Sequence, residues 1–227
     1  MNIKNTILLI SFLIFALYSD SHSETKFPEL KIDTKNSPAN GISNIYFYGK
    51  KLQATGDVKN FKKNGKWKIF HDNSKLYAEG LFRDDLKEGE WAFYDDSGKI
   101  LYKITYLQDI INGPKYSFYP SGVPHMEEWF KNAVKNGKCM EYYEDGIPKE
   151  ISWYTDGIKN GQSNTYYKLG KQQAIGNYTK GKKNGQWILF NENGKIGSRG
   201  MYTNDRQTGK WEFFDDKGKK TEDKDFN

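Results

Sequence analysis

The chain has 227 residues and a net charge of +6, with 36% apolar and 16% aromatic residues. Because apolar residues are so few, little interior can be buried, and aromatic side chains must supply much of the covering surface. The lysines stand in turns beside Asp, Glu and Asn instead of gathering in one basic stretch, which argues against nucleic acid as a partner.

The first 23 residues have the composition of a secretory signal peptide. Lys4 precedes an apolar run at 7–17, and small residues stand at Ser21 and Ser23. The run is shorter than the roughly 20 residues that span a bilayer. We therefore expect a signal peptide at 1–23, no transmembrane span in the mature form, and a secreted or periplasmic protein that could associate with the envelope. An uncleaved N-terminal anchor is the alternative.

The rest of the chain divides into a short leader and a repeat array. Residues 24–40 are polar, contain Pro28 and Pro38 and show no period, so we interpret them as a polar leader or cap. From residue 41 to residue 227, glycines recur every 24 residues. They stand at Gly41, Gly65, Gly89, Gly113, Gly137, Gly161, Gly185 and Gly209. An exact period of this length predicts a repeat architecture with eight units that start near these glycines.

Each unit has the composition of a β-hairpin. An aromatic residue stands five positions after the repeat glycine, as at Phe70, and a second glycine commonly follows nine positions after it, as at Gly98. A second extended run then leads to another turn, which we expect to end at the Asn-Gly of the next unit. The pattern predicts an all-β fold, an elongated single-layer antiparallel meander of about eight hairpin repeats.

Tryptophans and glycines are correlated across the repeats. In four places a tryptophan follows a glycine by eleven residues. The pairs are Gly56 with Trp67, Gly80 with Trp91, Gly176 with Trp187, and Gly200 with Trp211. Where Lys115, Cys139 or Ser163 replaces the tryptophan, the glycine is missing too. We predict that each indole lies flat over its glycine on the neighbouring strand, so that these eight residues are structural.

The middle units, between about residues 107 and 160, depart from this pattern. They gain several prolines and place Trp129 and Trp153 sixteen positions after the repeat glycine. Strand alternation puts these two tryptophans on the face opposite the other indoles. Together with Tyr119 and Tyr143 they are our candidate binding residues, since exposed aromatic clusters often mark contacts. The alternative is that they fill a kink in the sheet or meet a second subunit.

The unit resembles the MORN repeat in its bacterial variant form, which is found in exported proteins and in proteins labelled as antitoxins. The resemblance rests on "NGKWKIFHDNSKLYAEGLF" and "NGQWILFNENGKIGSRGMY" and extends over most of 41–227. It implies antiparallel hairpins, contacts with proteins or membranes, and no catalytic residues. The secretion signal disfavours a cytoplasmic antitoxin role. A weaker resemblance, to choline-type and cell-wall-binding repeats, implies an aromatic cage for a quaternary ammonium group.

No constellation of side chains points to catalysis. The chain shows no nucleophile-elbow, phosphate-loop or metal-ligand spacing, and the pair Asp95 and Asp96 stands in a repeating turn. The lone Cys139 has no partner for a disulfide. We expect no enzyme, cofactor or metal, but an exported scaffold that binds a protein partner or the envelope surface. A cell-wall or choline-type anchoring module is the alternative, and the oligomeric state is left open.

Overall fold

The structure is a computed structural model that describes residues 27–47 and 51–226. The predicted signal peptide at 1–23 lies outside these residues. Contacts divide the chain into two units, Met1–Lys31 and Ile32–Asn227. In the first unit, residues 27–31 form neither helix nor strand. All the strands belong to the second unit.

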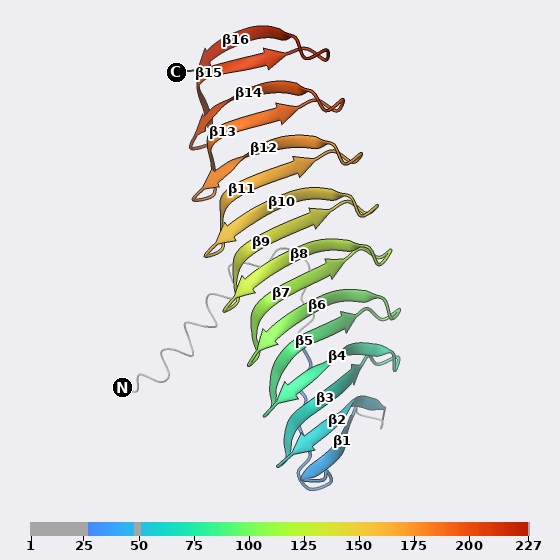
Figure 1. The fold of residues 1–227 in the computed structure, drawn as a ribbon. Coiled ribbons are helices and arrows are strands. Elements are labelled where there is room, and N and C mark those ends of the chain that lie inside the picture. The colour runs from blue at the N-terminus through green and yellow to red at the C-terminus, as the bar shows by residue number, and fades with distance from the viewer. Residues whose placement is uncertain (1–26, 48–50, 227) are drawn as a thin grey trace, which may run out of the picture. The chain divides into compact units, whose positions relative to one another are not determined.

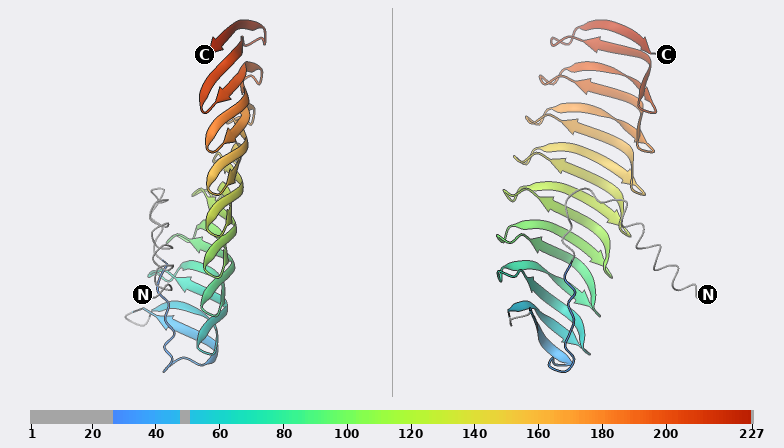
Figure 2. Two further views of the ribbon diagram at one scale, coloured as in Figure 1. Left: turned by 90° about the vertical axis from the view of Figure 1, so that its left-hand side faces the viewer. Right: turned by 180° about the vertical axis from the view of Figure 1, so that it is seen from behind.

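The second unit is a sheet of sixteen strands that pair strictly in chain order, each antiparallel to the next (Figure 1). The strands are β1 (Asn40–Tyr46), β2 (Leu52–Lys59), β3 (Lys62–Phe70), β4 (Leu76–Arg83), β5 (Leu86–Tyr94), β6 (Ile100–Leu107), β7 (Ile110–Phe118), β8 (Pro124–Lys131), β9 (Val134–Tyr142), β10 (Pro148–Thr155), β11 (Ile158–Tyr166), β12 (Gln172–Thr179), β13 (Lys182–Phe190), β14 (Ile196–Thr203), β15 (Arg206–Phe214) and β16 (Lys220–Phe226). The described residues contain no helix. The views in Figure 2 show a single layer of strands, so the predicted all-β meander of eight hairpins is confirmed.

The turns between units do not lie where the Asn-Gly pairs predicted them. The chain reverses at Asn60 and Phe61, which have φ of 50° and 57°, as a two-residue type I′ turn requires. Asn64 and Gly65 instead lie inside β3. The register of β2 against β3 shifts between Gly56 and Val58, and Gly65 has φ of 71° there. The repeat glycine therefore serves a β-bulge, which needs a left-handed residue just as a turn does.

One column of residues runs straight across the sheet and defines its packed face. Cross-strand neighbours in this column include Trp67 with Gly80, Cys139 with Ser152, and Ser163 with Gly176. We call this side the indole face, because Trp67, Trp91, Trp187 and Trp211 all lie on it. Most of the buried apolar side chains gather there. The opposite side is called the back face.

Candidate binding surfaces

The four glycine-paired indoles lie directly on the backbone of the preceding strand. A Cβ atom added to Gly56 would lie 2.3 Å from Cγ of Trp67, and one added to Gly200 would lie 2.3 Å from Cδ2 of Trp211. The Trp67 indole N–H donates to the Asp57 carbonyl oxygen at 2.7 Å, and the other three indoles make the equivalent bond. Each of these side chains is at most 3% exposed. Their rings are therefore committed to packing and offer no binding surface.

Aromatic rings extend these pairs into two stacks on the indole face. In the first, the Phe82 ring meets Trp67 and Trp91 edge to face, with centroid distances of 6.0 and 4.9 Å. The second stack contains, in order, Tyr178, Trp187, Tyr202, Trp211 and Phe226. The stacks are interrupted over β7 to β11, where the column contains no indole.

An ion pair takes the place of the indole at Cys139. The Lys135 ammonium lies 2.5 Å from the Glu128 carboxylate and 4.5 Å from the centre of the Tyr154 ring. Burial disfavours the charged lysine, but the hydrogen bond and charge of Glu128 outweigh it, so the pKa of Lys135 lies above its usual value. Burial raises the pKa of the Cys139 thiol to about 11, against the opposing charge of Lys135. A thiol with this pKa is a poor nucleophile at neutral pH.

The next unit repeats the arrangement. Lys159 is paired with Glu150, and its ammonium lies 4.5 Å from the centre of the Tyr178 ring. Ser163, which replaces the indole here, donates its hydroxyl to Glu150 at 2.8 Å. The middle units thus cover the indole face with partly buried ion pairs instead of flat rings.

The back face carries the two remaining tryptophans. Trp129 in β8 is 42% exposed, and Trp153 in β10 is half-buried and pairs across the sheet with Lys138. Their Cβ atoms would lie 3.1 and 3.3 Å from a Cβ atom on Gly137 and Gly161, so the repeat glycines make room for them. They lie on the face predicted from strand alternation, because their neighbours Glu128 and Ser152 belong to the column on the indole face.

Apolar side chains lie near these tryptophans in the middle of the back face. Tyr116 in β7 and the cross-strand neighbours Met140 and Ile151 are half-buried there. At the two ends of the sheet the corresponding pairs are charged. These pairs are Lys68 with Glu79 at one end, and Lys210 with Asp225 and Glu212 with Asp223 at the other. The central back face therefore has apolar side chains where these end pairs have charges, and the pair of Ile175 and Ile188 continues them into β12 and β13.

Tyr119 and Tyr143 lie apart from the two tryptophans. Each is at the turn within its hairpin, and each hydroxyl donates to a backbone carbonyl in the next hairpin, at 2.7 and 2.8 Å. Trp129 pairs with Pro114, near the other end of the same two strands. The structure therefore does not bring the four predicted residues into one patch. Sequence reasoning missed this tyrosine ladder, which Tyr167 extends with a bond to the Phe190 carbonyl oxygen.

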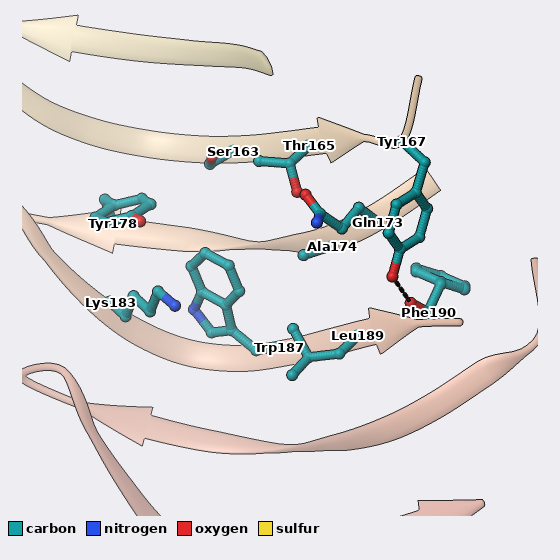
Figure 3. Close-up of a pocket in the computed structure, with 10 residues that line it drawn as sticks. All are labelled: Ser163, Thr165, Tyr167, Gln173, Ala174, Tyr178, Lys183, Trp187, Leu189 and Phe190. Carbon is teal, nitrogen blue, oxygen red and sulfur yellow. Dashed lines mark hydrogen bonds between the residues drawn. The ribbon is translucent and has the colours of Figure 1, made fainter. Parts of the chain in front are cut away.

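Sequence reasoning also missed a hollow on the indole face, with a volume of about 420 Å³. It lies beside Ser163, and its lining includes Ala174, Trp187 and Leu189 (Figure 3). The signal for it is the serine at a position where four other units have tryptophan.

The described residues show neither a metal centre nor a membrane-spanning helix. Among residues 27–47 and 51–226, no three His, Cys, Asp or Glu side chains are grouped so that they could hold a metal ion. The same residues include no helix with the length and apolar character needed to cross a bilayer.

The fold defines a β-repeat protein whose candidate binding surfaces are the faces of one sheet. In a comparison with family models, the model described as MORN repeat variant matches residues 63–84 and 87–108. Two consecutive units of the chain are therefore similar to the MORN repeat in its variant form. Repeats of this family commonly bind proteins or membranes and are in general not enzymatic. The comparison with curated proteins found no match.

Proposed function

We propose that this protein is an exported, non-catalytic scaffold that binds a protein partner through the middle of its back face. The observation that carries the proposal is the exposed Trp129 on the same face as Trp153, two strands away, in the part of the back face that has two tryptophans. Tryptophan is enriched among residues that dominate interface energies, at about 2 kcal/mol or more each. A sheet face of this kind supports a partner with an apolar contact surface.

The cell-wall or choline-type alternative has less support from the geometry. Such a module needs aromatic rings that stand open around a quaternary ammonium group. The four regular indoles are buried against glycines, and each ring N–H is already bonded. Trp129 and Trp153 lie two strands apart with Lys138 between them in the sheet, and a lysine there would repel a cationic ligand.

The back-face proposal is tested by the double substitution Trp129→Ala and Trp153→Ala in the tagged mature chain. We expect a partner captured from the native envelope fraction to be lost, while strand content and thermal unfolding change little. The matched control is Leu81→Ala with Met201→Ala, because these exposed residues occupy the same repeat position outside the middle units. Capture that survives in the tryptophan variant, or unfolding of that variant at a clearly lower temperature, would count against the proposal.

Export rests on the sequence alone. Lys4, the apolar run at 7–17 and Ser23 support cleavage before Glu24. Intact-mass spectrometry of the protein from its native source should therefore find a chain that begins at Glu24. A chain that retains Met1 would show that the segment is an anchor or is not processed.

A further inference from the structure

The hollow on the indole face lies where the second aromatic stack begins. Ser163 in β11 pairs across the sheet with Gly176, and the Trp187 indole from β13 lies over that glycine. In the next unit, Trp187 itself pairs in the same way with Gly200, beneath Trp211. The hollow therefore lies beside Ser163, over β11 to β13, next to the first indole of the second stack.

The lining of the hollow combines aromatic and apolar side chains with polar groups. Trp187, Ala174 and Leu189 supply the apolar part, and Ser163, Thr165 and Gln173 supply polar groups (Figure 3). The volume of about 420 Å³ lies at the small end of the range of roughly 300 to 1,000 Å³ that is typical of ligand pockets. One aromatic side chain is an appropriate occupant for a hollow of this size, because the Tyr178 and Trp187 rings in the lining offer aromatic surface against which it can pack.

A lysine in the lining adds a charge to this site. Lys183 stands at the same repeat position as four other lysines, Lys63, Lys87, Lys135 and Lys159, and each of the five has its ammonium over an aromatic ring. The other four are ion-paired, two with aspartates and two with glutamates. The Lys183 ammonium lies 4.7 Å from the centre of the Trp187 ring, and among the described residues no carboxylate lies within ion-pair distance of it. Asp205 accepts from the Lys183 backbone N–H instead.

We propose that this hollow binds an aromatic residue of a partner protein. A carboxylate close to the ring of that residue forms an ion pair with the Lys183 ammonium. Glu150, which lies beside Ser163, is already held by Lys159 and by the Ser163 hydroxyl. The site lies on the face opposite Trp129 and Trp153, since Ser152 and Ser163 pair on the indole face while Trp153 points the other way. It is therefore independent of the back-face proposal.

The proposal is tested with two small probes that share an indole and differ in charge. N-acetyl-L-tryptophan carries a carboxylate, and N-acetyl-L-tryptophan amide does not. Titration of the isotope-labelled protein, followed by NMR at the indole N–H signals, should shift Trp187 saturably while Trp211 stays unchanged. We expect the carboxylate probe to bind at least about threefold more tightly than the amide at low salt, because salt screens an exposed ion pair.

Two variants decide what causes the shift. Lys183→Met should make the two probes bind equally, whereas Lys87→Met, which removes a lysine already paired with Asp109, should leave the difference intact. Absence of a saturable Trp187 shift, equal shifts at all the indoles, or an unchanged probe difference in Lys183→Met would overturn the proposal.

Discussion

The regular units and the middle units follow the same backbone path but cover it differently. In the regular units, a buried indole such as Trp91 lies flat on a glycine of the preceding strand. In the middle units the same column contains Lys115, Cys139 and Ser163 instead, together with Glu128, and Glu128 and Glu150 form partly buried ion pairs there. Strand pairing continues through both regions without a break.

The difference shows that the path of the sheet does not depend on the residue that covers it. Turns with two left-handed residues and bulges at the repeat glycines recur in both regions, as at Asn60 and Phe61 and again at Asn132 and Ala133. The covering residue instead sets local stability. Burying an apolar side chain contributes about 1.5 to 3 kcal/mol, whereas a partly buried ion pair is often neutral compared with an apolar pair. The middle units should therefore be the less stable part of the sheet, which is where binding surfaces are commonly found.

The prediction with the largest expected change in stability concerns the removal of one covering residue from each region. Trp91→Ala should cost about 4 kcal/mol in unfolding free energy, because it leaves a large cavity under a fully buried ring. Cys139→Ala, at the same repeat position, should cost about 1 kcal/mol. Urea unfolding measures the total change in unfolding free energy. Hydrogen exchange shows which units lose stability, since the units of a repeat protein need not unfold together. Equal costs would remove the distinction between the regions.

The second test concerns the space under an indole. Gly200→Val should cost about 2 kcal/mol, because even its Cβ atom would overlap the Trp211 ring. In a Trp211→Ala background the same valine should cost little or should stabilise, since valine is normally the better strand residue. The double-mutant cycle measures this coupling. A valine with the same effect in both backgrounds would mean that the ring and the glycine act separately.

Most of the fold could be predicted from the sequence, because its determinants are short-range and repeat at a constant period. The spacing of Gly56 and Trp67 predicts both that their strands pair and that the two residues lie on the same face of the sheet. One correlation in the sequence therefore predicts a three-dimensional contact. The Asn-Gly of Asn64 and Gly65 was misread, because turns and bulges both favour a left-handed residue and local sequence does not separate them.

The candidate site was less predictable. The face of Trp129 follows from strand alternation, but its exposure depends on which neighbours the register brings beside it. Tyr119 bonds to a carbonyl 23 residues further along the chain, and that contact follows only from how adjacent hairpins stack. The hollow beside Ser163 likewise depends on the position of the Trp187 ring, for which a single substituted residue is a weak sign.

The prediction with the smallest expected effect concerns whether the ion pairs stabilise the middle units. Lys135→Met should cost about 2 kcal/mol, because the Glu128 side chain is only 14% exposed and would be left without its partner. Adding Glu128→Leu should recover most of this loss, since two packed apolar residues often match a buried ion pair. Lys210→Met is the matched control: its pair with Asp223 is 59% and 36% exposed, and Asp223 keeps its pair with Lys220, so the substitution should leave the unfolding free energy nearly unchanged. If the double substitution remains as unstable as Lys135→Met alone, the ion pair itself stabilises the middle of the sheet, and the two regions differ in the kind of covering and not in its strength.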